Sequence, residues 1–134
     1  MKRVKESMYI GKDNIFLDTN NVFRDVIEIM NVNHLGAVSI TQDKKVVGII
    51  TDGDVRRLLL RTQKTLPELF MTKVEKVMKK NPVVINATSS LDDALDIMEK
   101  NKFTVMPVVD KKKKLIGIIH IHKLLIDIVG GEKK

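Results

Sequence analysis

The residues of this 134-residue chain with the clearest chemical potential are residues 51–54, which read Thr-Asp-Gly-Asp. They follow an apolar run and precede a helical pattern, so they fall where a strand turns into a helix and offers free backbone N–H groups to an anion. Thr51 can donate to a phosphate, Asp54 can accept from two vicinal hydroxyls, and Gly53 would let the backbone approach a ligand or take a positive φ. Three arginines follow that can bind an anion bidentately: Arg56, Arg57 and Arg61. Asp54 is also a good helix cap without any ligand, and both interpretations stay open.

A second segment of the same kind lies 69 residues further on and reads His120-Ile121-His122-Lys123. Its lysine stands where the first segment has Asp54, and an ammonium group only donates, so it cannot accept a hydrogen bond from a diol. A phosphate or the carboxylate of an acidic sugar suits the lysine and the two histidines better. Histidines at this spacing lie on one side of an extended segment, which would fit a metal ion. Because no further ligands cluster with them in the sequence, we predict no metal site.

Both segments belong to an internal repeat. Residues 22–40 align with residues 90–108 at an offset of 68. Further along the chain, Gly48 pairs with Gly117 at an offset of 69, so the second copy holds one extra residue in its turn. Two copies of one unit therefore account for most of the chain.

Each copy is predicted to fold as β-α-β-β-α. Apolar residues recur at helical spacing over residues 22–30 and 91–98. Two apolar runs around a charged turn follow each helix, as in a hairpin of buried strands, and a second helix ends the copy. The predicted strands cover residues 15–17, 35–40, 46–50, 83–85, 105–109 and 115–119, and the final helices cover residues 55–61 and 123–129.

These elements predict an α+β fold in which the two repeats pack sheet to sheet with pseudo-two-fold symmetry. One repeat is too small to cover its sheet alone, so we expect one intertwined domain with a shared core. The predicted organisation is an N-terminal leader (1–13), the first repeat (14–62), a structured linker (63–80), the second repeat (81–131) and a tail (132–134).

Composition excludes several classes of function. The chain has no cysteine, which removes disulfides, thiolate metal sites and a cysteine nucleophile. Its apolar runs are too short to span a membrane and its start lacks the apolar region of a secretion signal, so we expect a cytoplasmic protein. The net charge of +7 favours an anionic partner, but only 4% aromatic residues leave little for base stacking, and we predict no nucleic-acid partner. We also predict no catalytic residues, because no nucleophile–base pair or glycine-rich phosphate loop is present.

Taken in order, the motifs resemble a tandem pair of cystathionine-β-synthase (CBS) domains, also called a Bateman module. The resemblance is carried by GIITDGDVRR from Gly48, VMKKNPVVI from Val77, ALDIMEKNKFTVMPVVD from Ala94 and LIGIIHIHKLL from Leu115. Among such pairs, the chain looks most like the C-terminal regulatory half of bacterial arabinose 5-phosphate isomerases, where a sugar-isomerase (SIS) domain precedes the pair. Because the pair already occupies these 134 residues, we expect no catalytic activity on this chain.

The resemblance implies a ligand site built from Thr51, Gly53, Asp54 and Arg57. In CBS pairs the T-x-x-D motif holds the ribose and phosphate of a nucleotide, and the base packs on the opposite copy. The apolar residues at those positions are Pro82, Val83, Val84, Met106 and Pro107, although a Met-Pro pair at a strand end is equally ordinary in a core. The second cleft, with His120, His122 and Lys123, departs from the family pattern.

We therefore predict a regulatory module rather than an enzyme. It would bind an effector, either a nucleotide of the AMP or ATP type or a nucleotide-sugar such as a CMP-activated sugar acid, and would need no cofactor. It would form a homodimer through its helices and modulate an attached or associated sugar-phosphate isomerase. The alternative is a structural homodimerisation module with degenerate, empty clefts, which the lost second aspartate and the apolar helix faces favour.

Overall fold

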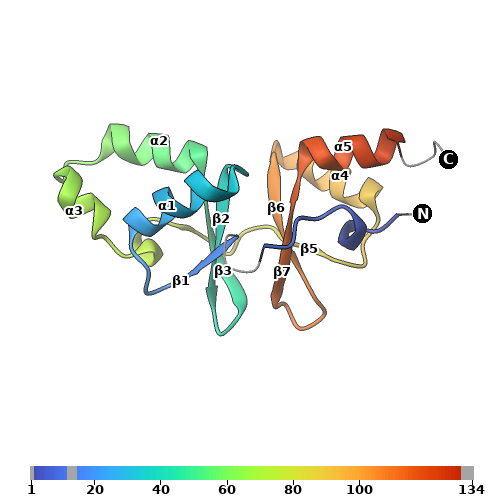
Figure 1. The fold of residues 1–134 in the computed structure, drawn as a ribbon, viewed down its shortest axis with the longest axis horizontal. Coiled ribbons are helices and arrows are strands. Elements are labelled where there is room, and N and C mark those ends of the chain that lie inside the picture. Colours follow the sequence, from blue (N-terminus) through green and yellow to red (C-terminus); the bar gives the residue numbers. More distant parts are fainter. Residues whose placement is uncertain (1, 12–14, 131–134) are drawn as a thin grey trace. The chain divides into compact units, whose positions relative to one another are not determined.

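The computed structural model describes residues 2–11 and 15–130, which form two compact units. The first-repeat unit comprises Lys12–Pro82, and the second-repeat unit comprises Met1–Gly11 together with Val83–Lys134. Each unit contains strands and helices in the order β-α-β-β-α (Figure 1). The predicted α+β repeat is therefore confirmed.

A four-stranded sheet forms the centre of the first-repeat unit. The elements are, in chain order, β1 (Phe16–Asp18), α1 (Phe23–Asn33), β2 (Ala37–Gln42), β3 (Lys45–Thr51), α2 (Asp52–Arg61), α3 (Leu66–Phe70), the 3-10 helix η2 (Val74–Lys76) and β4 (Lys79–Lys80). The strand order is β1-β2-β3-β4, with β1 parallel to β2 and β3 antiparallel to both of its neighbours. Strand β3 thus leads directly into α2, where the candidate ligand residues lie.

The second-repeat unit repeats this arrangement around a three-stranded sheet. Its elements are the 3-10 helix η1 (Val4–Glu6), β5 (Ile85–Asn86), α4 (Leu91–Asn101), β6 (Val105–Val109), β7 (Leu115–His120) and α5 (Ile121–Gly130). The strand order is β5-β6-β7, with β5 parallel and β7 antiparallel to β6. Strand β7 leads into α5 as β3 leads into α2.

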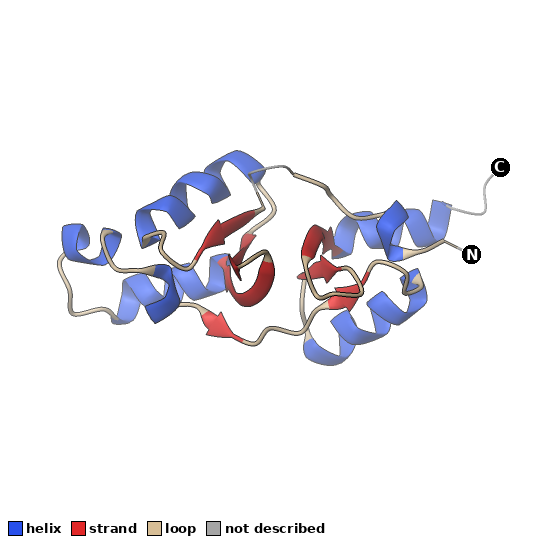
Figure 2. Ribbon diagram, turned by 90° about the horizontal axis from the view of Figure 1, so that it is seen from below, coloured by secondary structure: helices blue, strands red, loops and turns tan. Residues whose placement is uncertain are grey.

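Each unit has a core of its own between its sheet and the helices on one face of that sheet (Figure 2). In the first-repeat unit, Phe23 of α1 clusters with Ile40 of β2. In the second-repeat unit, Met98 of α4 clusters with Ile119 of β7 and Leu124 of α5. Phe23 and Met98 belong to the apolar stripes over residues 22–30 and 91–98, which is why periodicity located α1 and α4 correctly. No helix in the described part of the chain is long and apolar enough to cross a membrane.

Residues 2–11, predicted as a leader, pack into the second-repeat unit. Val4 is fully buried in its core, and the backbone of Tyr9 forms a bridge with that of Ile118 in β7, with N···O distances of 2.8 and 3.0 Å. The first-repeat unit has the same arrangement, because η2 and β4 lie beside β3. The segments share a Val-x-x-x-Met pattern, with Val4 and Met8 in one and Val74 and Met78 in the other.

The two repeated glycines give these methionines room. A Cβ placed on Gly48 of β3 would clash with the side chain of Met78, and one placed on Gly117 of β7 would lie 2.6 Å from the sulfur of Met8. Real Cβ atoms do not approach other atoms so closely, so each strand needs glycine where the following or preceding segment crosses it. The two units therefore share a packing detail as well as an element order.

Candidate functional site

Thr51 and Asp54 form a capping box at the junction of β3 and α2. The hydroxyl of Thr51 accepts a hydrogen bond from the backbone N–H of Asp54 at 3.3 Å, and Asp54 Oδ2 accepts one from the backbone N–H of Thr51 at 3.0 Å. This reciprocal pair satisfies two backbone donors at the start of the helix. The N-cap is therefore Thr51, not Asp54, and α2 begins three residues before the predicted start at Val55.

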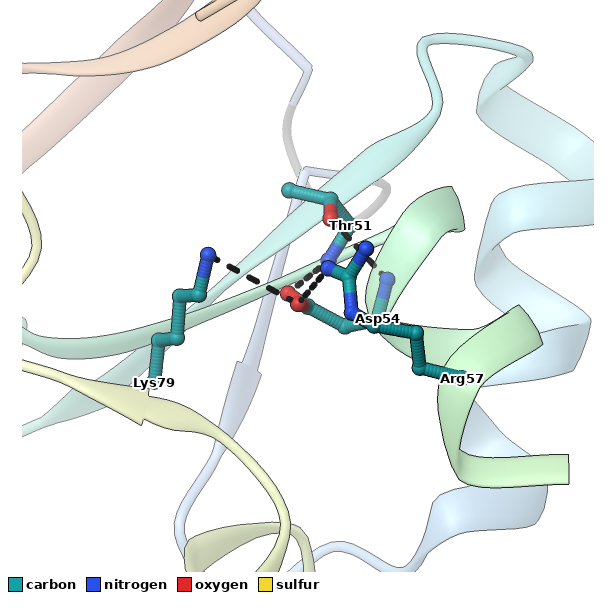
Figure 3. Close-up of polar contacts among 4 residues, drawn as sticks. All are labelled: Thr51, Asp54, Arg57 and Lys79. Atoms are coloured by element: carbon teal, nitrogen blue, oxygen red, sulfur yellow. Dashed lines mark hydrogen bonds and ion pairs between the residues drawn. The ribbon is translucent and has the colours of Figure 1, made fainter. Parts of the chain in front are cut away.

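The other carboxylate oxygen of Asp54 faces two cations (Figure 3). Arg57 Nη2 donates to Asp54 Oδ1 at 2.7 Å, and Nζ of Lys79 in β4 lies 3.8 Å from the same oxygen. The side chain of Asp54 is 13% exposed, whereas those of Arg57 and Lys79 are 51% and 64% exposed. The acid is thus fixed in place while both cations border on solvent.

The charge state of Asp54 follows from these contacts. Burial by itself raises the pKa of Asp54, but hydrogen bonds from Thr51 and Arg57 and the nearby charge of Lys79 outweigh it, and the pKa lies below its usual value. The carboxyl group is ionised at neutral pH, and an ionised carboxylate is the acceptor that a vicinal diol needs.

Gly53 is the second residue of α2 and lies within the first turn of this helix. A Cβ at this position would lie 3.3 Å from Arg57 Nη1, so the glycine keeps space for the guanidinium that reaches Asp54. The predicted positive φ at Gly53 is not found. Of the three neighbouring arginines, Arg57 reaches the acid, while Arg56 and Arg61 are exposed on α2.

In the second-repeat unit, the start of α5 has a different chemistry. The backbone N–H of His122 donates to His120 Nδ1 at 3.2 Å, so His120 caps the helix from the position that Thr51 has in the first repeat. Burial, followed by the neighbouring His122, lowers the pKa of His120. The neutral imidazole is the form that can accept this hydrogen bond.

Lys123 forms an ion pair within α5. Its Nζ lies 2.8 Å from Asp127 Oδ2, and the hydroxyl of Ser7 donates to the same oxygen at 2.6 Å. The hydrogen bond from Lys123 and that from Ser7 hold the pKa of Asp127 below its usual value. The lysine that replaces the diol-binding acid therefore has an internal partner, which the sequence interpretation missed. Within residues 2–11 and 15–130, His, Asp and Glu side chains nowhere gather in a group of three or more that could hold a metal.

The apolar residues predicted to pack against a nucleotide base fall into two groups by exposure. Val83, in the loop before β5, is 41% exposed, and Pro82 and Val84 beside it are half-buried. Met106 is 1% exposed and belongs to the core cluster of the second-repeat unit, and Pro107 is buried in β6. The side chain of Met106 thus stabilises its own unit, as the ordinary interpretation of the Met-Pro pair expects.

Two repeats that each present polar residues at a strand-to-helix junction define a tandem module, and the comparisons with known proteins identify its family. The family model for the CBS domain matches residues 5–61 and 74–130. The chain therefore belongs to the CBS domain family and carries two copies of the domain.

Sequence relatives include longer proteins. Protein RP505 of Rickettsia prowazekii is 32% identical over 126 residues, which cover 93% of this chain and 37% of that protein. Arabinose 5-phosphate isomerase KdsD of Francisella tularensis is 31% identical over 111 residues, which cover 80% of this chain and 31% of the isomerase. The predicted resemblance to arabinose 5-phosphate isomerases is thus confirmed, and the chain spans about a third of the length of the curated relatives it matches.

Solved structures share the fold along nearly the whole chain. The structure of CBSX2 in complex with AMP matches with a TM-score of 0.82 at 23% identity, covering 99% of this chain and 100% of CBSX2. The CBS domain pair of MJ0100, in complex with 5′-methylthioadenosine and S-adenosyl-L-methionine, matches with a TM-score of 0.80 at 23% identity, covering 99% of both chains. At these identities the likeness establishes the fold of a CBS pair.

Proposed function

We propose that this chain is a regulatory module that binds a nucleotide or nucleotide-sugar at the start of α2 in its first repeat. Asp54 would accept from the vicinal hydroxyls of the sugar, and Thr51 together with the α2 N-terminus would face the phosphate. Arg57 would supply a bidentate contact to the anionic part of the ligand. Pro82, the last residue of the first-repeat unit, offers apolar surface for a base.

The observation that carries the proposal is the rigid, ionised carboxylate of Asp54. The capping box fixes its position, its pKa is lowered, and cations lie on its open side. A partly buried carboxylate that the capping box already holds in place loses little freedom on binding, which favours affinity. The AMP and S-adenosyl-L-methionine complexes of the related folds support a ligand that contains a ribose.

The match to KdsD supports an isomerase as the regulated enzyme. In that setting the effector would be a product of the sugar pathway, and a CMP-activated sugar acid fits the chemistry of the site. Its ribose suits Asp54, while its phosphate and carboxylate suit Arg57 and the net charge of +7. We further propose that the module acts in the cytoplasm on a sugar-phosphate isomerase domain to which it is attached or bound.

The second repeat would bind a different ligand or none. Lys123 replaces the diol acceptor and is paired with Asp127, so a ribose finds no carboxylate at this place. A phosphate or carboxylate ligand would have to compete with Asp127 for the ammonium of Lys123. We therefore propose that the first repeat is the nucleotide site.

Thermal unfolding with a panel of ligands tests the proposal: AMP, ATP, S-adenosyl-L-methionine, CMP and a CMP-activated sugar acid. At 100 times its Kd, a ligand that binds only the folded chain adds about 2.7 kcal/mol to the free energy of unfolding. Asp54→Asn keeps an acceptor for the helix cap but loses the charge, so it should abolish the shift in melting temperature. Asp52→Asn, at the exposed first position of α2, is the matched control and should retain the shift. If wild type responds to no ligand of the panel, the proposal is wrong.

Exposed apolar side chains support the alternative of a homodimerisation module. They lie on α2 and α5: Leu59 (46% exposed), Leu60 (85%), Leu125 (41%), Ile126 (67%) and Val129 (69%). Apolar helix surface of this kind is typical of interfaces. Sedimentation at micromolar concentration separates the alternatives, because a tight dimer that gives no response to any ligand of the panel favours the structural role.

A further inference from the structure

Both carboxylate oxygens of Asp54 have a partner within the first-repeat unit. Oδ2 accepts from the backbone N–H of Thr51, and Oδ1 accepts from Arg57 and lies beside Lys79 (Figure 3). Each oxygen has a second lone pair that can accept a hydrogen bond. Oδ1 is the oxygen outside the capping box, so a diol that leaves the start of α2 intact would approach Oδ1, beside Arg57 and Lys79. The two cations occupy the side from which such a ligand arrives.

The consequence depends on the charge of the ligand. A neutral diol that displaces Arg57 and Lys79 from Oδ1 leaves both cations without their partner, which opposes binding. A ligand with an anionic group next to the diol binds Oδ1 of Asp54 through the diol and gives Arg57 and Lys79 the anionic group as a new partner. The guanidinium and the ammonium are both more than half exposed, so each can turn toward such a group.

The second repeat gives an internal comparison. Lys79 pairs with Ile49 in β3, and Tyr9 forms the corresponding bridge with Ile118 in β7, so Tyr9 is the counterpart of Lys79. The counterpart of Arg57 at the offset of 69 is Ile126. The second repeat, which has Lys123 in place of the acid, thus has neither cation at the corresponding positions.

We infer that Lys79 and Arg57 determine ligand specificity by selecting nucleotides over nucleosides at Asp54. This inference rests on the proposed function of the Asp54 site. Lys79 is the new element, because it comes from β4, a segment that the sequence interpretation assigned to a linker. Lys79 and Arg57 both pair with the carboxylate of Asp54. They release this carboxylate to the diol only when the ligand brings a negative charge with which they can pair instead.

Isothermal titration calorimetry with AMP against adenosine, and with CMP against cytidine, tests the inference. In wild type we expect the nucleotide of the binding pair to bind at least about tenfold more tightly than its nucleoside. Lys79→Met should reduce this ratio by about threefold and Arg57→Met by about tenfold, with higher salt reducing the ratio in wild type. Lys80→Met is the matched control, since Lys80 is the next exposed lysine of β4 and its side chain points to the other side of the strand.

The outcomes separate the inference from the proposed function. If AMP or CMP binds, Asp54→Asn abolishes binding and Lys79→Met lowers the ratio while Lys80→Met does not, both stand. If binding depends on Asp54 but the ratio is the same in wild type, Lys79→Met and Arg57→Met, the charge selection is wrong and the proposed function survives. If AMP, CMP and their nucleosides all fail to bind wild type, the charge selection is wrong, and the thermal panel with the CMP-activated sugar acid decides the proposed function.

Discussion

Lys123 is the third residue of α5, as Asp54 is of α2, and its ammonium lies 2.8 Å from the carboxylate of Asp127, one helical turn further on. The same carboxylate oxygen accepts a hydrogen bond from Ser7, which belongs to the N-terminal segment. The two repeats therefore share a fold but differ in the chemistry of the corresponding helix start. One presents an acid beside two exposed cations. The other presents an ion pair within α5, and a hydrogen bond from Ser7 to the acid of that pair ties the N-terminal segment to the helix.

Ser7→Ala tests the contribution of this tie to stability. Ser7 is fully buried and donates to a charged carboxylate at 2.6 Å, so removing its hydroxyl should lower the free energy of unfolding by about 1–2 kcal/mol. Urea denaturation followed by circular dichroism measures the change. Ser89→Ala, at a partly exposed position in the same unit, should change stability by less than about 0.5 kcal/mol. Equal values for the two variants would contradict the role of the tie.

Thr51→Ala tests the capping box of α2. The hydroxyl of Thr51 accepts from the backbone N–H of Asp54, and loss of such a cap typically costs about 1 kcal/mol. Chemical denaturation in the absence of ligand isolates this effect. Thr51→Ser keeps the acceptor and should restore most of the loss, whereas a serine variant as unstable as the alanine variant would argue against capping.

Acidification should weaken the start of α5. His120 accepts a hydrogen bond through Nδ1, and its folded-state pKa lies below the usual 6.5, chiefly because of burial. Since the unfolded chain then takes up a proton before the folded chain does, this contribution is complete above about pH 6.5 and is lost as the pH falls through the lowered value. The shifted carboxyl groups Asp54, Glu68, Asp110 and Asp127 titrate below their ordinary values, at still lower pH.

The test compares wild type with His120→Asn, because asparagine caps helices without titrating in this range. The denaturation midpoint of wild type should be lower at pH 5 than at pH 7.5. The midpoint of the asparagine variant should change less between these two pH values. His122→Asn, which keeps the imidazole of His120, should behave more like wild type. If wild type and His120→Asn respond identically to pH, the histidine cap is not what the acid disrupts.

Gly48→Ala should destabilise the first-repeat unit. The added methyl group would collide with Met78 and lie 3.1 Å from the backbone oxygen of Lys79, and such overpacking typically costs about 1–3 kcal/mol. Because β4 also carries Lys79, the same variant should weaken nucleotide binding in calorimetry. Gly130→Ala is the control, since a Cβ there meets nothing within 4 Å. A Gly48→Ala variant as stable as Gly130→Ala would contradict the close packing.

The two repeats and their order of elements could be predicted from the sequence, because the apolar pattern of each repeat is long and periodic. The stripes that contain Phe23 and Met98 extend over about three turns each, and both helices form where predicted. Thr51 and Asp54 could be assigned to one site from the sequence, because both lie at a predicted helix start and a capping box depends only on residue type and local spacing. The start of α2 was predicted too late because Gly53 and the two aspartates weaken the helical pattern.

The remaining features depend on contacts that are distant in sequence. Lys79 reaches Asp54 only because the two-residue strand β4 pairs with β3, and a strand of this length has no periodicity to recognise. Residues 2–11 were predicted as a leader for the same reason, although the shared pattern of Val4 and Met8 with Val74 and Met78 was a usable signal. Which face Met106 presents is decided by the packing of α4 and α5 on β6, so strand alternation alone could not settle it.

Backbone amide signals in a heteronuclear NMR titration test the central claim most directly. On addition of the nucleotide that binds, chosen from AMP, ATP, CMP and a CMP-activated sugar acid, we expect the largest shifts at Thr51, Gly53 and Asp54, with Arg57 and Lys79 following. The amides of His120 and Lys123 should shift far less, and Asp54→Asn should remove the effect. No shifts with any of these ligands, or shifts centred on the start of α5, would contradict a nucleotide site in the first repeat.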